Sequence, residues 1–146
     1  MHTVDILIVI LLAISGLIWL FAKVGRRLLG RVQRVSCQDI LKRLEAGEEI
    51  IILDIREKKD FNNFLGHIVH SINMPFLELK EKLEKGGLDL SGFFSVPVVI
   101  VEQSDSLKGA KAYKMLKAHG FEKVEVLDGG FAKWTKMQLP VTRYEG

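Results

Sequence analysis

The chain has 146 residues, of which 48% are hydrophobic and 27% charged, and its formal net charge is +3 at pH 7. This length suggests one domain of ordinary size with an additional segment. Five of the 21 basic residues and one of the 18 acidic residues precede Val35, which leaves 16 basic and 17 acidic residues for the rest. That near-neutral remainder argues against a nucleic-acid-binding surface. The single cysteine, Cys37, excludes an intrachain disulfide and a cysteine-based metal site, which fits a cytosolic setting.

An uninterrupted run of apolar, Ser and Gly residues, ILIVILLAISGLIWLFA, extends from Ile6 to Ala22. With Val4 and Asp5 included, it reaches the lower end of bilayer-spanning length. A cleaved signal peptide would carry its positive charge before the apolar run, whereas here MHTVD precedes it and KVGRRLLGR follows it. A buried core helix would not normally have flanks this polarised. We therefore expect a transmembrane anchor in residues 1–24, with Val4 to Ala22 in the membrane.

The charges after this run predict its orientation. The basic residues that follow it at once are Lys23, Arg26, Arg27 and Arg31. Because positively charged flanks stay in the cytoplasm, we expect the N-terminus outside and the domain in the cytosol. Residues 25–34 would form a basic juxtamembrane linker that contacts anionic lipid, at about 1 kcal/mol per basic residue. The domain would occupy residues 35–146.

Apolar patterning after the linker predicts helices and short strands in alternation. The elements expected in the first half are a helix, a strand, a helix, a strand and a helix, over Ser36–Ala46, Ile50–Leu53, Glu57–Leu65, Ser71–Met74 and Leu77–Lys85. The second half should hold a loop and then strand, helix, strand and helix, over Leu88–Val96, Pro97–Val101, Lys108–Ala118, Val124–Leu127 and Phe131–Met137. The strand Ile50–Leu53 is a continuous apolar run of mostly β-branched residues, which indicates burial on both faces. The predicted class is α/β, with a mainly parallel central sheet flanked by helices.

Local signals add detail to these elements. Ser36 should cap the first helix, with Asp39 at the capping-box position. The aromatic and leucine side chains expected to face the core or to be tucked against it are Phe61, Phe64, Leu65, Phe93, Phe94, Phe131 and Trp134.

Ligands of parallel α/β sheets bind at the carboxyl ends of the strands. This rule points to Glu102, which follows the strand Pro97–Val101, and to the Gln103–Leu107 loop before the next helix. Helix N-termini at such places bind anions and lower the pKa of thiols. Yet the loop contains no Cys, His or Arg.

Residues 35–142 resemble a single rhodanese domain. The matching segments are IILDIREKKDF at Ile51–Phe61, GHIVHSINMP at Gly66–Pro75, PVVIV at Pro97–Val101 and KAHGFEKVEVLDGGFAKW at Lys117–Trp134. The order of anchor, basic linker and domain is similar to that of small membrane-anchored rhodanese-like proteins of the bacterial inner membrane. The resemblance implies a rhodanese-like fold. It also implies a reaction in which a Cys thiolate, placed right after the PVVIV-type strand, takes sulfur from a donor such as thiosulfate and passes it to an acceptor.

In this resemblance Glu102 stands at the position of the catalytic Cys. A carboxylate cannot carry a sulfane sulfur, so the ordinary reaction is unavailable and no catalytic residue is assigned. The equivalents of the active-site loop, one residue longer than usual and with a single cation, are Gln103, Ser104, Asp105, Ser106, Leu107 and Lys108. The residues to which the resemblance gives structural roles are Asp54, Arg56, Gly66, His67, Gly129, Gly130 and Trp134.

Two further residue patterns are weak signals. His67 and His70 have i, i+3 spacing, but no carboxylate follows at ligand spacing, so we expect neither a metal nor a cofactor. The acids of the loop allow two interpretations. Either any polar residue is tolerated there, or a carboxylate of Glu102 or Asp105 bonds the N–H groups that begin the next helix.

The sequence therefore favours a non-enzymatic module that binds or regulates an unknown protein partner at the cytoplasmic face of a membrane. The alternative is an atypical thiosulfate-type sulfurtransferase that uses Cys37 or a partner's thiol. A phosphatase or arsenate-type activity on the same scaffold ranks last, because it needs a Cys nucleophile.

Overall fold

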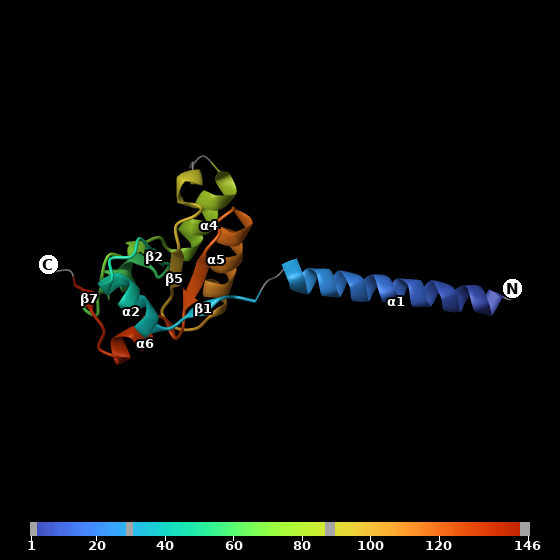
Figure 1. Cartoon of the computed structure of the whole chain (residues 1–146), viewed down its shortest axis with the longest axis horizontal. Helices are drawn as coiled ribbons and strands as arrows, with labels where there is room; N and C mark the ends of the chain where they lie inside the picture. Colours follow the sequence, from blue (N-terminus) through green and yellow to red (C-terminus); the bar gives the residue numbers. More distant parts are fainter. Residues whose placement is uncertain (1–2, 29–30, 87–89, 144–146) are drawn as a thin grey trace. The chain divides into compact units, whose positions relative to one another are not determined.

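The computed structural model describes residues 3–28, 31–86 and 90–143, and of residues 3–5, 7 and 20–28 it describes the backbone only. The chain forms two compact units, Met1–Arg31 and Val32–Gly146, and each is described by itself (Figure 1). The first two residues of the predicted loop over Leu88–Val96 lie outside the described residues. The same holds for parts of the predicted anchor, linker and C-terminus.

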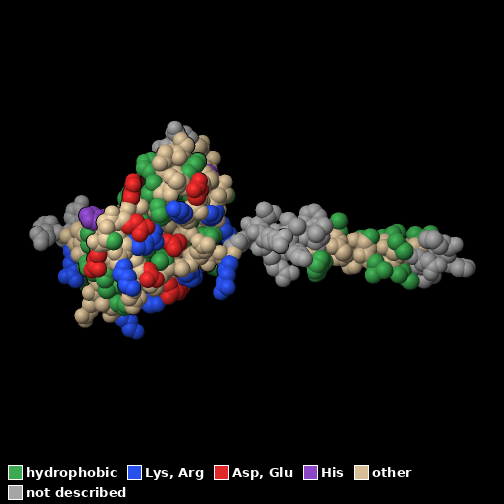
Figure 2. All heavy atoms as spheres, viewed as in Figure 1, with side chains coloured by type: hydrophobic (Ala, Val, Ile, Leu, Met, Phe, Trp, Pro, Cys, Tyr) green, Lys and Arg blue, Asp and Glu red, His purple; other side chains and the backbone are tan. Residues whose placement is uncertain are grey.

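The first unit contains one helix, α1, over Thr3–Leu28. Its described side chains, Ile6 and residues 8–19, are exposed within this unit, and the apolar ones are green in Figure 2. Within the part of the chain that the structure describes, no helix combines the length and the apolarity that crossing a membrane requires. The anchor over Val4 to Ala22 therefore has no support from the structure and stays a prediction from the sequence.

The second unit is built on a five-stranded parallel sheet in the order β1-β6-β5-β2-β4. These strands are β1 Arg34–Val35, β2 Ile51–Asp54, β4 Ile72–Asn73, β5 Val98–Val101 and β6 Val124–Leu127. A separate antiparallel pair joins β3, His67–Ile68, to β7, Val141–Thr142. The predicted α/β class with a mainly parallel sheet is confirmed. The two-residue strands β1, β3 and β7 were not predicted, because they are too short to show a period.

The helices follow the predicted order with one marked difference. They are α2 Cys37–Glu45, α3 Lys58–Phe61, α4 Phe76–Lys85, the 3-10 turn η1 Ser91–Phe93, α5 Leu107–Ala118 and α6 Gly130–Lys136. The Ser36 hydroxyl accepts the Asp39 N–H at 3.1 Å, which confirms the predicted cap. Helix α3, predicted over Glu57–Leu65, ends at Phe61. The chain leaves the helix there because the Asn63 side chain accepts the Leu65 N–H at 2.9 Å in a turn.

Two predicted core aromatics lie at the surface. Phe64 follows the shortened helix α3 and is 83% exposed, and Phe93 in η1 is 52% exposed. Phe94 packs against the core as expected, edge-on to Phe121 with ring centroids 5.2 Å apart. The prediction was therefore wrong for Phe64, for Phe93 and for Leu65, which is 37% exposed. All three belong to short irregular segments where the apolar period does not fix a face.

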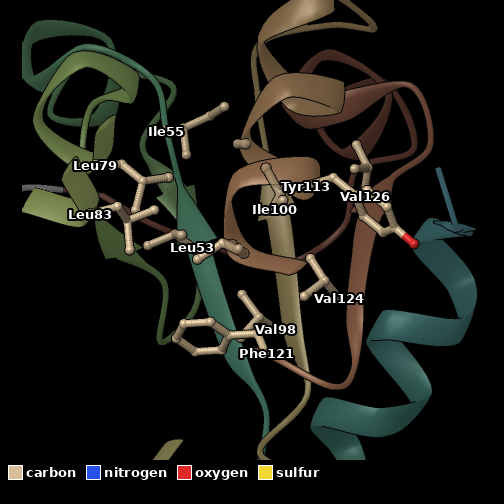
Figure 3. Packing of buried hydrophobic residues seen from close by; sticks show 12 residues of the cluster. Leu53, Ile55, Leu79, Leu83, Val98, Ile100, Tyr113, Phe121, Val124 and Val126 are labelled. Atoms are coloured by element: carbon tan, nitrogen blue, oxygen red, sulfur yellow. The ribbon is translucent and has the colours of Figure 1, made fainter. Parts of the chain in front are cut away.

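The sheet separates two apolar cores. Alternate residues of β5 point to opposite faces, so Val98 and Ile100 join one core while Val99 and Val101 join the other. The first core packs α4 and α5 against the sheet, as Figure 3 shows with Leu79 and Leu83 across from Leu53. The second packs α2 and α6, with Phe131 and Trp134 fully buried as predicted. Helices thus cover both faces of the sheet, and the site predicted from the sequence lies at the carboxyl ends of its strands.

Candidate functional site

The carboxyl ends of the three central strands place the site residues side by side. Asp54 at the end of β2 pairs in register with Val101 at the end of β5, so Glu102 emerges beside the turn that follows β2. The predicted location at this edge of the sheet is therefore where the structure places Glu102. Its side chain is only 4% exposed.

The Glu102 carboxylate is held by the start of α5. Oε1 accepts the Ser106 N–H at 3.0 Å, and Oε2 accepts the Gly109 N–H at 3.1 Å. The Ser106 hydroxyl also donates to Oε2. Ser106 in turn caps the helix, since its oxygen accepts the Lys108 N–H at 3.2 Å. One interpretation of the acidic loop was that a carboxylate bonds the N–H groups that begin the next helix. The Glu102 carboxylate makes these bonds.

Gly109 makes room for this carboxylate. A Cβ at residue 109 would overlap Oε1 of Glu102 and lie 2.9 Å from its Cδ. Gly109 is buried in the first turn of α5, where any side chain would push the carboxylate away from the N–H groups. The sequence showed this glycine as an isolated Gly in a helical pattern, which is a signal of close packing, but not which group packs against it.

Asp105, the other acid of the loop, has different partners. Its Oδ1 accepts from Arg34 Nη1 at 2.6 Å and from the Gly129 N–H at 3.1 Å. Asp105 therefore fastens the loop to β1 and to the turn after β6, and not to the start of α5. Sequence reasoning missed the contact with Arg34, which is 71 residues away along the chain.

The loop backbone rests on the Gly129–Gly130 turn. Phe131 N–H donates to the Glu102 carbonyl at 2.8 Å, and Ala132 N–H donates to the Gln103 carbonyl at 2.9 Å. A Cβ on Gly130, whose φ is 61°, would lie 2.6 Å from the Glu102 carbonyl oxygen. The turn thus needs glycine both for its left-handed conformation and for the close approach of the loop.

Arg56 and Asp54 form a buried ion pair next to the loop. Arg56 Nε lies 3.0 Å from both Asp54 carboxylate oxygens, and Nη2 lies 2.9 Å from Oδ2. The guanidinium also donates to the Gly66 carbonyl at 3.1 Å and stacks on Phe131, with Cζ 3.8 Å from the ring centroid. A weaker bond of 3.4 Å reaches Gln103 Oε1. These contacts bury both side chains and hold them together beside the loop; the structural role expected of the pair stays a prediction.

The remaining motif residues also make packing contacts. His67 is buried, stacks on Phe61 with centroids 3.7 Å apart, and has Nδ1 3.1 Å from the Phe61 carbonyl oxygen. Gly66 has a φ of 75°, and a Cβ there would overlap the Thr142 carbonyl oxygen. Trp134 donates its indole N–H to the Pro140 carbonyl at 3.0 Å.

The histidine pair does not form part of a metal-ligand cluster. His70 is exposed, whereas His67 is stacked in the interior. Among the residues that the structure describes, no three His, Cys, Asp or Glu side chains are grouped so that they could hold a metal ion.

A pocket of about 260 Å³ opens beside Glu102. Its lining carries both signs of charge, from Arg56, Lys108, Glu57, Asp60 and Glu102. Mixed charge also covers the face of the domain drawn in Figure 2, where Lys and Arg side chains are interspersed with Asp and Glu. The pocket is therefore not the cationic cavity that an anionic sulfur donor would favour.

Cys37 lies in the second core and not at the pocket. Its side chain is 0% exposed, and Sγ is 3.7 Å from the Asp128 carbonyl oxygen. Burial raises the pKa of the thiol, and the nearby Lys133 opposes this only in part. A thiol of this kind is a poor nucleophile at neutral pH.

Comparison with known proteins agrees with this fold. The family model for the rhodanese-like domain matches residues 36–137. A Buchnera aphidicola protein is 34% identical over 95 residues, which are 65% of this chain and 60% of that protein. An adenylyltransferase and sulfurtransferase of Oryza sativa is 30% identical over 110 residues, which are 70% of this chain and 24% of that protein. The chain thus spans less than two thirds of either relative.

Solved structures show the same fold. The solution structure of a rhodanese-like domain from Anabaena has a TM-score of 0.62 at 26% identity, over 78% of this chain and 81% of that one. A thiosulfate sulfurtransferase from Pseudomonas aeruginosa also has a TM-score of 0.62, at 18% identity over 77% of this chain and 20% of that one. At 18% identity, the likeness to the Pseudomonas aeruginosa protein shows a shared fold and nothing further.

Proposed function

The chain belongs to the rhodanese-like family, and on that premise we propose that it is a binding or regulatory module rather than a thiol-dependent sulfurtransferase. The observation that supports this most is the engagement of Glu102. In sulfur transfer a thiolate attacks the outer sulfur of thiosulfate, the S–S bond breaks, and sulfite leaves with the bonding electrons. The carboxylate at position 102 cannot form that persulfide. It also accepts the hydrogen bonds of the Ser106 and Gly109 N–H groups, which would stabilise a thiolate at this position.

The alternative route through Cys37 gains no support from the contacts of this residue. Its thiol is fully buried among apolar side chains on the second core, and its raised pKa keeps it protonated at neutral pH. A donor anion would have to enter that core to reach the sulfur.

Thiocyanate formation from thiosulfate and cyanide tests the proposal on the full chain. We expect background rates for the wild type and for Cys37→Ser. We expect a gain for Glu102→Cys and for the double variant Cys37→Ser/Glu102→Cys, because the Ser106 and Gly109 N–H groups would then face a thiolate. Glu102→Ser is the matched control without a thiol. Wild-type activity that disappears in Cys37→Ser would overturn the proposal.

The membrane location is the second part of the proposal, and its support comes from the sequence. The apolar run over Val4 to Ala22 is followed by a basic segment in residues 25–34, which is the order of a single-pass anchor with the N-terminus outside. Carbonate washing of bacterial inner membranes should leave the full chain bound and release a chain that lacks residues 1–24. Protease added to right-side-out vesicles should spare the domain, and protease added to inverted vesicles should cleave it.

The partner is proposed to be a protein that contacts the rim of the pocket beside Glu102. Leu107, the first residue of α5, is 76% exposed and lies between Ser106 and Lys108, which line the pocket. Crosslinking of the full chain in membranes, followed by identification of the product, should give a partner that is lost in Leu107→Asp. Leu77→Asp, at a leucine of α4 that is 70% exposed, is the matched control.

A further inference from the structure

The face of the sheet that α4 and α5 cover holds a second pocket, of about 220 Å³. Figure 3 shows five of its lining residues, namely Leu53, Leu79, Leu83, Val98 and Phe121. Val98 begins β5 and Glu102 follows its end, so this pocket reaches the other end of the strand, about 13 Å away. Among the described residues, none lines both this pocket and the one beside Glu102. The second pocket is therefore a separate feature, to which the proposed function gives no role.

The lining of this pocket is apolar apart from one residue that the structure describes. Leu83 and Val98 are buried core residues, whereas Ile72 and Phe93 are 54% and 52% exposed. Contact of such side chains with water is unfavourable, and a ligand with an apolar chain would relieve it. An apolar cavity of about 150 Å³ accepts benzene, so about 220 Å³ has room for roughly nine carbon atoms. The pocket thus suits a chain of medium length.

Lys82 is the exception in the described lining. It lies three residues after Leu79 and directly before Leu83, so it borders the helix face that these buried leucines turn to the core. Its side chain is 43% exposed, and Nζ lies 2.9 Å from Oε1 of Glu78. Because the side chain both lines the pocket and reaches solvent, its apolar stem contacts the wall and its ammonium group lies at the mouth. The mouth therefore carries a positive charge.

We propose that this pocket binds a fatty acid of medium chain length, with its chain against the core and its carboxylate beside Lys82. The chain matches the apolar lining. The carboxylate matches the ammonium group, which has three N–H donors and directs one of them at Glu78. A cationic amphiphile would be repelled by Lys82, and an uncharged one would gain nothing from it. The inference depends on this pocket alone and not on the proposed function.

The test is titration of the full chain, ¹³C-labelled at its Leu and Val methyl groups, with fatty acids of even chain length from butanoate to dodecanoate, below the concentrations at which they form micelles. The methyl signals of Leu83 and Val98 should shift and saturate, while those of Val99, on the other face of the sheet, should not. Affinity should rise about fourfold per methylene group up to decanoate, because each methylene is buried from water, and should then level off.

The chain-length series distinguishes a site from adsorption to apolar surface, including that of α1. Affinity that keeps rising beyond decanoate, or shifts that reach Val99 equally, would overturn the inference. So would methyl signals of Leu83 and Val98 that do not respond to decanoate. This series uses the wild type, so it decides the matter even where a substitution prevents folding.

Substitutions at the mouth test the carboxylate. Lys82→Gln should weaken decanoate by about two- to fivefold, as expected for a half-exposed ion pair, and should leave decanol unchanged. Lys80→Gln, at a lysine of α4 outside the described lining, is the matched control. Equal affinity of the wild type and Lys82→Gln for decanoate would overturn the inference, as would an equal loss in Lys80→Gln.

A charge at the rim tests the position of the chain. Phe93→Asp should weaken decanoate at least tenfold, because it removes apolar contact and repels the carboxylate, whereas Phe64→Asp should not. Unchanged binding in a folded Phe93→Asp would overturn the inference. The thiocyanate assay does not involve this pocket. Wild-type thiocyanate activity would therefore overturn the proposed function alone, and failed decanoate binding would overturn the inference alone.

Discussion

Replacement of Gly109 by alanine should have opposite effects in two backgrounds. In an ordinary helix interior the change from glycine to alanine stabilises by about 1 kcal/mol, because alanine loses less backbone entropy. Here the new Cβ would overlap Oε1 of Glu102, so the carboxylate must leave the start of α5. In Glu102→Ala this obstacle is gone, and the closest remaining neighbour is Cγ1 of Val126 at 3.2 Å.

The expected changes in the free energy of unfolding follow from the hydrogen bonds that the substitution removes. Displacement of the carboxylate loses the bonds from the Ser106 and Gly109 N–H groups, each worth about 1.5–3 kcal/mol for a charged acceptor, and water recovers part of this. Gly109→Ala should therefore destabilise the wild type by about 2–4 kcal/mol after the helix gain is subtracted. In Glu102→Ala the same change should lie between neutral and about 1 kcal/mol stabilising.

Urea unfolding of the four full-length proteins measures this coupling. The fluorescence of Trp134, which is fully buried, reports the loss of the second core. The coupling energy between residues 102 and 109 should be about 3 kcal/mol, well above the scatter of about 0.5 kcal/mol for independent sites. An equal effect of Gly109→Ala in both backgrounds would refute the reasoning, because the glycine would then serve the helix and not the carboxylate.

Three other predictions use paired positions or a pH series, each measured by urea unfolding. Arg56→Gln should destabilise by about 3–5 kcal/mol because it leaves a buried carboxylate unpaired, whereas Arg34→Gln at a half-exposed pair should change stability by less than about 1 kcal/mol. Equal losses of stability in Arg56→Gln and Arg34→Gln would contradict the burial of the Arg56–Asp54 pair. Phe131→Ala should remove about 3–5 kcal/mol from the second core, and Phe64→Ala should be nearly neutral at 83% exposure. Burial raises the pKa of Cys37 in the folded chain above the ordinary value of 9.0, so the unfolded chain loses its proton first. Stability should therefore fall as pH rises above about 9, and Cys37→Ala should lack this part of the decline. An equal fall in the stability of the wild type and of Cys37→Ala would show that Cys37 does not cause the decline.

The regular parts of the fold could be predicted because their signals are local. The strands around Ile52 and Val99 are continuous apolar runs, and α5 shows a clear helical period that ends before Gly120. The short elements could not be predicted in this way. β1, β3 and β7 have two residues each, and their pairing depends on partners distant in the chain. Phe64 was misplaced because α3 ends in a side-chain turn at Asn63 that the apolar pattern does not show.

The site was predictable in position but only partly in detail. The rule about carboxyl strand ends located Glu102, and the acidic loop suggested a carboxylate at a helix start. The sequence could not decide between Glu102 and Asp105, because that choice depends on which side chain turns inward after β5. The space that Gly109 leaves for the Glu102 carboxylate and the bond from Arg34 to Asp105 both depend on how the helices and strands pack together. They become visible only when the elements are assembled.

The position of β1 has a mechanical consequence. Any pulling force that reaches the second unit through the residues before Val32 acts first on this two-residue strand. β1 lies parallel to β6, and Val126 N–H and Asp128 N–H bond the carbonyls of Gln33 and Val35, each at 2.9 Å. A pull along the strand axis therefore loads these bonds together in shear. Since Arg34 of the same strand is bonded to Asp105, tension in β1 would also be transmitted to the site loop.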